Sequence, residues 1–248
     1  MIDWLLLVAA GIGGGLAGSI AGLASVSTYP ALLAVGLPPV TANITNTVAL
    51  VLNGVGSVWG SLPELRGQRR KLMRLIPAAV VGGAAGAALL LSISSDGFEK
   101  VVPVLLAASA VVIALPQRKR AEGASRSTTQ RILEGVAVLA ICVYGGFFGA
   151  AAGVLLLALL LRTDSTSMAD ANATKNVVLG IANAVAAIGF IVLVPIPWLA
   201  VLPLGLGCLI GARLGPVIVR HAPTTPLRLA IAVAGVALAV KLGLDAYR

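Results

Sequence analysis

A pattern of glycine, asparagine and threonine residues occurs twice in this chain, about half a chain apart. The run GGLAGSIAG at 14–22 is matched by GGFFGAAAG at 145–153. Further along, the stretch ANIT at 42–45 is matched by ANAT at 171–174, in the same order and at nearly the same spacing. Such self-similarity indicates an internal duplication. The sequence therefore predicts two related halves that pack together.

The apolar character of the chain decides which solvent these halves face. Apolar residues make up 58% of the 248 residues, and charged residues make up only 11%. A water-soluble domain carries roughly 25% charged residues, so this surface cannot face water all round. We therefore expect an all-α polytopic membrane protein. The predicted apolar segments are 4–24, 25–36, 41–60, 72–93, 99–116, 132–162, 170–194, 197–219 and 226–246.

The clearest linker is the basic stretch 117–131. It separates repeat one, residues 1–116, from repeat two, residues 132–248, within a single transmembrane domain. Short loops rich in lysine and arginine stay in the cytoplasm, so the net charge of +9 indicates membrane orientation and not nucleic-acid binding. By this rule the linker and the loop 66–74 are cytoplasmic, and Asp96 lies outside. No basic region precedes the first apolar run, so we expect no cleaved signal peptide and a multi-pass protein of the inner or plasma membrane.

Two topologies fit the apolar segments. Loops at equivalent positions in the two halves carry different charge, as oppositely oriented repeats should. Segment 132–162 is short for two full crossings at about 1.5 Å per residue, but it suits two half-helices that meet at a turn. The alternative has eight full crossings and parallel repeats. We favour inverted repeats with broken or re-entrant glycine-rich helices.

The paired glycines at 14–15 and 145–146 are candidates for the substrate site. Each glycine weakens a helix by about 1 kcal/mol relative to alanine, and a helix breaks inside a membrane only where protein or water satisfies the freed groups. A broken helix exposes backbone N–H groups at its positive end, which binds anions. The alternative is close packing of helices, which we prefer for the glycines of 82–86 and 207–215.

Asparagine and threonine residues begin the apolar segment after each glycine run. A helix cap explains one or two of them, but not four or five within a turn and a half. Unpaired polar groups are costly in hydrocarbon, so we expect these side chains to face a cavity or one another. Lys175 is the strongest candidate as a cation inside an apolar helix, although Lys175 and Arg213 have the alternative of snorkelling to the surface. The predicted substrate-binding residues are Gly14, Gly15, Asn43, Thr45, Asn46, Gly145, Gly146, Asn172, Thr174, Lys175, Asn176 and Arg213.

The chemistry of these residues favours a small anion. Amide, hydroxyl and backbone N–H donors around a lysine suit an oxyanion. Cys142 and Cys208 lie in apolar stretches, where we expect two small buried side chains. His221 is the only histidine, so the sequence predicts no metal site, no cofactor and no catalytic residues.

The chain resembles the TauE/SafE-type sulfite exporter family, also described as the 4-toluene sulfonate uptake permease group. The resemblance covers nearly the whole chain. It implies a multi-pass inner-membrane transporter of sulfite, sulfonates or related anions, and not an enzyme, with export as the implied direction. The motifs that carry it are Gly11-Ile12-Gly13-Gly14-Gly15, Ala42-Asn43-Ile44-Thr45-Asn46, the glycines of 145–153, Ala171-Asn172-Ala173-Thr174 and Ile210-Gly211-Ala212-Arg213-Leu214-Gly215.

The resulting prediction is a secondary transporter that moves a small sulfur-containing anion through a site midway across the membrane. Rocking of one repeat against the other exposes such a site alternately to the two sides. Two alternatives stay open: a structural or assembly subunit whose polar residues bind partner helices, and, less favoured, a membrane-embedded enzyme. The expected partners are the anion and the lipid bilayer, and a homodimer is left open.

Overall fold

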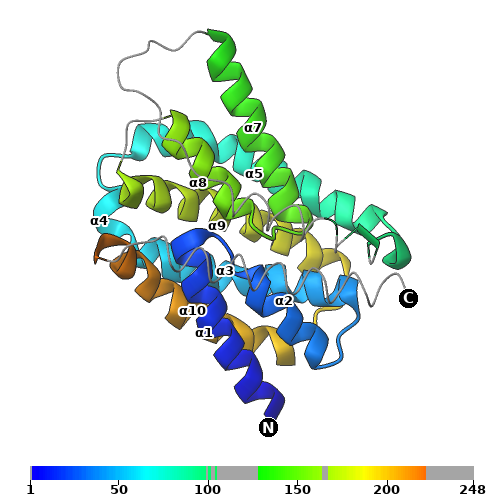
Figure 1. The fold of residues 1–248 in the computed structure, drawn as a ribbon. Coiled ribbons are helices and arrows are strands. Elements are labelled where there is room, and N and C mark those ends of the chain that lie inside the picture. The colour runs from blue at the N-terminus through cyan, green and yellow to red at the C-terminus, as the bar shows by residue number, and fades with distance from the viewer. Residues whose placement is uncertain (1, 99, 102–103, 105–127, 164–166, 222–248) are drawn as a thin grey trace.

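The computed structural model describes residues 2–98, 100–101, 104, 128–163 and 167–221, and these residues form helices joined by short turns (Figure 1). The prediction of an all-α fold is confirmed for this part of the chain. The predicted segments 99–116 (apart from 100–101 and 104) and 226–246 lie outside it, as does most of the linker. The helices are α1 (Ile2–Ala21), α2 (Ser25–Ala34), α3 (Pro39–Gly60), α4 (Leu62–Leu65), α5 (Arg69–Ser92), α7 (Thr128–Phe147), α8 (Ala152–Thr163), α9 (Met168–Leu193) and α10 (Trp198–His221).

Helix α7 begins at Thr128, so the predicted linker 117–131 extends too far by one helical turn. Threonine, glutamine and arginine are tolerated in a first turn, and composition alone did not separate them from the linker. Helix α7 therefore begins four residues before the predicted start of repeat two at 132, and the boundaries of the repeats stay a prediction.

Four of the described helices are long and apolar enough to cross a membrane. They span Asp3–Ala21, Arg69–Ser92, Met168–Leu193 and Trp198–Val219, and two shorter apolar helices span Ile132–Phe147 and Ala152–Leu161. Large apolar side chains cover the outer faces of these helices, as Val192 and Leu199 illustrate with exposed fractions of 75% and 74%. An exterior of this kind is solvated by lipid tails, which confirms the prediction of a membrane protein with several transmembrane helices.

Glycines bring two pairs of helices into close contact. A side-chain carbon at Gly207 or Gly211 would collide with backbone atoms of α1, so α1 and α10 pack backbone to backbone. A side chain at Gly82 or Gly86 would collide in the same way with α7, which fixes the contact between α5 and α7. Small residues at such spacing let membrane helices approach closely, and the packing interpretation of these glycines is confirmed.

The helix breaks do not fall at the glycine pairs. Gly14 and Gly15 lie inside α1, and Gly15 faces the backbone of α10 at Cys208. The chain turns instead at Gly22 and Gly149, where the backbone adopts positive φ values of 77° and 73°. The prediction that Gly14 and Gly15 open the backbone is therefore wrong, because tight packing of Gly15 against α10 and of Gly14 against the start of α2 outweighs their weak helix propensity.

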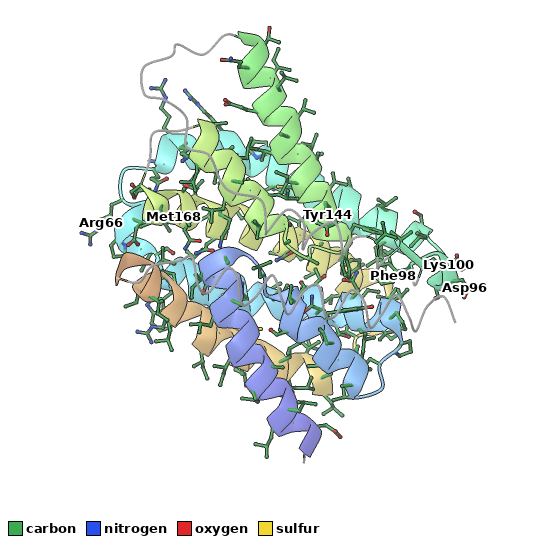
Figure 2. The ribbon with its side chains drawn as sticks, in the orientation of Figure 1. Arg66, Asp96, Phe98, Lys100, Tyr144 and Met168 are labelled. Carbon is green, nitrogen blue, oxygen red and sulfur yellow. The ribbon has the colours of Figure 1, made fainter. Side chains whose placement is uncertain are left out.

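Helices α3 and α9 pack against each other and run in opposite directions. Residues that follow the end of α3 contact the start of α9, where Gln68 Nε2 donates to the Asp170 carbonyl at 3.3 Å. Figure 2 shows Arg66 and Met168 at one end of the molecule, and Asp96 with Lys100 at the opposite end. The basic loop and the acidic loop therefore lie at opposite ends of the helix bundle, as the charge pattern predicts.

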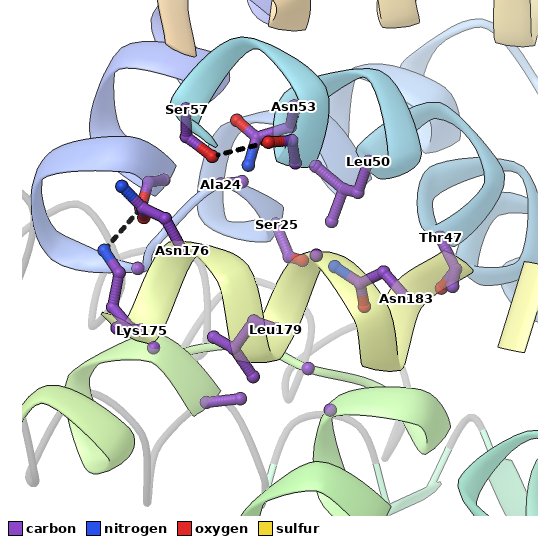
Figure 3. Close-up of a pocket in the computed structure, with 18 of the residues that line it drawn as sticks. Ala24, Ser25, Thr47, Leu50, Asn53, Ser57, Lys175, Asn176, Leu179 and Asn183 are labelled. Atoms are coloured by element: carbon purple, nitrogen blue, oxygen red, sulfur yellow. Dashed lines mark hydrogen bonds between the residues drawn. The ribbon is translucent and has the colours of Figure 1, made fainter. Parts of the chain in front are cut away.

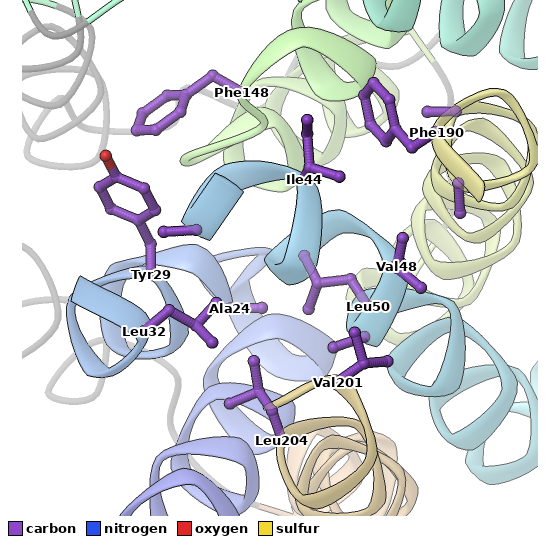
Figure 4. Packing of buried hydrophobic residues seen from close by; sticks show 14 of the residues in the cluster. Ala24, Tyr29, Leu32, Ile44, Val48, Leu50, Phe148, Phe190, Val201 and Leu204 are labelled. Carbon is purple, nitrogen blue, oxygen red and sulfur yellow. The ribbon is translucent and has the colours of Figure 1, made fainter. Parts of the chain in front are cut away.

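An apolar cluster packs around the start of α3 (Figure 4). Tyr29 from α2 meets Phe148 edge to face, with the ring centroids 5.5 Å apart. Ile44 from α3, Phe190 from α9 and Leu204 from α10 belong to the same buried cluster. These contacts tie α2 and α3 to the turn after α7 and so fix the geometry of the helix ends that meet at the centre.

Candidate functional site

The C-terminal end of α1 is held by two side chains from α9. Asn172 Nδ2 donates to the Ser19 carbonyl at 2.9 Å. Lys175 Nζ donates to the Gly18 carbonyl at 3.1 Å and to the Ser19 carbonyl at 3.3 Å. The last carbonyls of a helix lack partners within it and carry partial negative charge, so an amide and an ammonium group both suit them.

Lys175 does not reach the surface. Its side chain is 1% exposed, and both of its hydrogen bonds go to carbonyls of buried residues, Gly18 and Ser19. The alternative of a snorkelling lysine is therefore wrong for this residue. A lysine buried in this way is rare in membrane proteins, so a functional role is the default hypothesis for it.

The C-terminal end of α7 is held in a related way by α3, but without a charge. Asn43 Nδ2 donates to the Phe147 carbonyl at 2.7 Å. Asn46 lies one helical turn further along α3 and is hydrogen-bonded to α2. Its Nδ2 donates to Ser25 Oγ at 3.0 Å, and its Oδ1 accepts from Thr28 Oγ1 at 2.6 Å. This end of the site is therefore neutral.

The asparagines are not helix caps. Helix α9 is capped by Ser167, whose side chain accepts a hydrogen bond from the Asp170 backbone N–H at 3.1 Å. Helix α3 follows Pro38 and has no side-chain cap. Asn43 and Asn172 lie inside their helices and are fully buried, so the cap interpretation of these polar residues is wrong.

The two predicted threonines serve the helices themselves. Thr45 donates to the Thr41 carbonyl at 2.7 Å, within its own helix. Thr174 donates to Gln68 Oε1 at 2.6 Å and to the Asp170 carbonyl at 3.0 Å. Neither side chain has a donor left for a ligand, because each hydroxyl carries one proton.

A cavity of about 50 Å³ lies between α1, α3, α9 and the turn that joins α7 to α8 (Figure 3). Holding one water takes about 10–15 Å³ by this measure, so the space suits a few waters or one small polar group. The described residues that line it include no carboxylate. They are Gly18, Gly22, Ala24, Ser25, Thr47, Leu50, Asn53, Gly54, Ser57, Gly145, Phe148, Gly149, Ala152, Gly153, Lys175, Asn176, Leu179, Gly180 and Asn183.

Two amides on the cavity wall have no hydrogen-bond partner among the described residues. Asn53 and Asn183 come from α3 and α9, and Figure 3 shows both side chains at the cavity. Asn53 Oδ1 is buried without a partner, which is costly for a polar atom away from water. A bound polar ligand or ordered water would satisfy these groups.

Sequence reasoning missed Asn53 and Asn183, although the sequence contains a signal for them. Asn53 lies seven residues after Asn46, and Asn183 lies seven residues after Asn176, a spacing of two helical turns that places these side chains on one face. The prediction stopped at the first two turns of each helix, and this stripe of polar residues continues further. The cavity lies along the continuation.

The structure brings together only some of the predicted site residues. Gly145, Lys175 and Asn176 line the cavity. Asn43, Asn46 and Asn172 support its walls through the hydrogen bonds above. The predicted residues that neither line the cavity nor make these supporting hydrogen bonds are Gly14, Gly15, Thr45, Gly146, Thr174 and Arg213.

Two of these residues have other contacts. Gly146 packs against Gly83 of α5, as close helix packing requires. The Arg213 side chain is exposed, and its guanidinium carbon lies 3.8 Å from the centroid of the Trp59 ring. For Arg213 the structure therefore favours a surface position stabilised by a cation–π contact.

The profile of the family described as sulfite exporter TauE/SafE matches residues 7–242, which is nearly the whole chain. No curated protein and no solved structure matches the chain. Because this match covers nearly the whole chain, the protein belongs to the sulfite exporter TauE/SafE family of membrane transporters.

Proposed function

We propose that this protein is a secondary transporter that exports a small sulfur-containing anion, such as sulfite or an organosulfonate, across the inner membrane. The family supports the class of substrate. The observation that carries the site is the cavity beside Lys175, which combines a buried lysine with unpaired amides. Its volume suits a sulfur oxyanion or the head group of a sulfonate.

The electrostatics of the cavity favour an anion. The N-terminal ends of α2 and α8 reach it at Ser25 and Ala152, and a helix N-terminus presents free N–H groups and partial positive charge. Lys175 contributes a full charge in its protonated form, and the amides of Asn53, Asn176 and Asn183 add donors. With no carboxylate among the described lining residues, a cation would find little to compensate its charge there.

The site lies between two halves, which we propose are inverted repeats spanning 1–116 and 132–248. Reciprocal contacts support this: α9 holds the end of α1, and α3 holds the end of α7. The antiparallel course of α3 and α9 supports opposite orientations in the membrane.

In this proposal α1 with α2, and α7 with α8, are broken helices that re-enter from opposite sides. Rocking of one half against the other would then expose the cavity alternately. Because each helix end accepts a hydrogen bond from an asparagine of the opposite half, movement of one half changes the contacts of both ends. A homodimer stays a prediction.

Sulfite flux into proteoliposomes that contain the purified protein tests the proposal. We expect saturable uptake of labelled sulfite, with competition by organosulfonates such as taurine. Lys175→Met should lower the flux at least about tenfold, a loss that corresponds to roughly 1.4 kcal/mol of binding energy. Lys100→Met, which removes an exposed lysine at the end of the molecule, is the matched control and should transport like the wild type.

The outcomes are distinct. Saturable flux that Lys175→Met loses and Lys100→Met keeps would support both the substrate class and the site. Absence of flux for sulfite, sulfate, thiosulfate and taurine would overturn the substrate class. Flux that survives in Lys175→Met would place the site elsewhere in the chain.

A further inference from the structure

We propose that Lys175 couples the anion to a proton: its amine takes up one proton as the anion enters the cavity and releases it as the anion leaves. The inference rests on the proposed function, because it assigns the coupling ion of the same site. It concerns one side chain, whose contacts are all neutral.

The surroundings of Lys175 offer no countercharge among the described residues. Its side chain is 1% exposed, and its nitrogen donates only to the carbonyls of Gly18 and Ser19. An ammonium group without a counter-ion is expensive to bury, even where hydrogen bonds are made. The empty site therefore favours the neutral amine, and an anion in the cavity favours the ammonium.

The hydrogen bonds fit this exchange. A neutral amine has two N–H donors, and the two carbonyls of α1 accept both. The ammonium has one donor more, and it has no acceptor among the described residues. Lys175 lines the cavity, so an oxyanion there would accept the added N–H and neutralise its charge.

Other titratable groups on the helices around Lys175 lie off the cavity wall. Asp170, on the same helix, is hydrogen-bonded to Ser167, with its Oδ2 accepting from Oγ at 2.7 Å. Tyr144 of α7 donates its hydroxyl to the Ala150 carbonyl at 2.7 Å. The remaining described groups on packed elements are not among the lining residues: Asp3, Tyr29, Glu64, Arg69, Arg70, Lys71, Arg74, Glu134, Cys142, Cys208 and Arg213. Lys175 is therefore the titratable group that faces the anion in the described part of the chain.

The other half of the site limits the stoichiometry to one proton. At the position related to Lys175, α3 carries Asn46, whose amide is hydrogen-bonded to Ser25 and Thr28. An amide does not titrate, so these two related positions contribute one exchangeable proton between them. A monovalent sulfonate would move together with one proton, without net transfer of charge.

This coupling has a consequence for direction. An electroneutral cycle does not respond to membrane potential, and the anion and proton gradients together set its direction. Each pH unit by which the cytoplasm is more alkaline opposes export by about tenfold in anion concentration. Export then requires a cytoplasmic excess of the anion that exceeds this factor.

Methanesulfonate binding to the purified protein, measured by calorimetry across a pH series, tests the inference. Methanesulfonate stays a monoanion over this range, so any pH dependence belongs to the protein. Because the bound state holds the proton more tightly, affinity is full at low pH and is lost as the pH rises. On the alkaline side we expect the dissociation constant to increase about tenfold per pH unit, with one proton taken up per anion.

Two variants separate the coupling from the site. Lys175→Arg keeps a permanent charge and should bind methanesulfonate with no pH dependence, whereas Lys100→Met should keep the wild-type slope. If the arginine variant does not fold, proton uptake by the wild type, followed with an indicator dye, and its loss in Lys175→Met give the same test. The coupling would be overturned if wild-type binding does not depend on pH, or if the dissociation constant of Lys175→Arg still rises tenfold per pH unit. Either result would leave the proposed transport function unaffected. Absence of binding of methanesulfonate and sulfite at every pH would overturn the proposed function itself.

Discussion

The two helix ends that meet at the centre, that of α1 and that of α7, are built alike and charged differently. Each is followed by a glycine with positive φ, and each has a terminal carbonyl held by an asparagine of the opposite half. At the end of α1, Lys175 joins that asparagine, whereas at the end of α7 no cation does so among the described residues. The glycine and the asparagine fix the backbone at both helix ends, whereas Lys175 places an amine beside the cavity at the end of α1 alone.

The largest effect on stability is expected at the turn after α1. Gly22 has positive φ and faces the backbone of Gly153 without room for a side chain. Gly22→Ala should lower the free energy of unfolding by about 3 kcal/mol, from backbone strain together with overpacking. Unfolding in detergent micelles measures the loss.

Gly36→Ala is the matched control for this change. Gly36 also has positive φ, but nothing lies within 4 Å of the position its side chain would take. Gly36→Ala should therefore lower the free energy of unfolding only by the backbone strain, about 1 kcal/mol. Equal losses in the two variants would show that the contact between Gly22 and Gly153 contributes nothing.

An intermediate effect is expected when each asparagine is removed from its helix end. Asn43→Leu and Asn172→Leu each leave a buried carbonyl with one donor fewer, so each should lower the free energy of unfolding by about 1–3 kcal/mol. Only Asn172 shares its acceptor, the Ser19 carbonyl, with Lys175. Sulfite affinity should therefore fall further in Asn172→Leu than in Asn43→Leu, which calorimetry measures. Equal affinities would contradict the assignment of chemistry to the end of α1.

The smallest effect is expected at the paired threonines. Thr174 connects α9 to Gln68, whereas Thr45 donates only within α3. Thr174→Val should lower the free energy of unfolding by about 1 kcal/mol, and Thr45→Val by less than about 0.5 kcal/mol. Thermal unfolding of the two variants side by side checks the order. A larger loss at Thr45 would mean that its hydroxyl has a role beyond its own helix.

Much of this fold could be predicted from local features of the sequence. Apolar segments indicate membrane helices because a bilayer fixes their length, and glycines at 207–215 indicate close packing because small residues permit it. Lys175 could be predicted as a site residue because a charged side chain within an apolar membrane helix is costly and therefore rare. The duplicated asparagines indicate a shared role. In the structure, Asn43 and Asn172 each donate a hydrogen bond to a carbonyl at the end of a helix from the opposite half.

The position of the breaks and the extent of the site could not be predicted in this way. Gly15 stays helical because α10 packs on it, and that neighbour is distant in the sequence. Arg213 was placed in the site for its charge, although its contact with Trp59 depends on how α3 and α10 meet. The cavity is likewise lined by residues of α1, α2, α3, α7, α8 and α9, so its lining follows from tertiary packing and not from a single motif.

A crystal structure with bound selenite, the selenium analogue of sulfite, tests the central claim most directly. Anomalous scattering locates selenium without assumptions about the ligand. The proposed site predicts one peak in the cavity, within hydrogen-bonding distance of Lys175 and beside Asn183. A peak confined to the basic loop at Arg66–Arg74, or no peak in crystals of protein that transports sulfite, would contradict it.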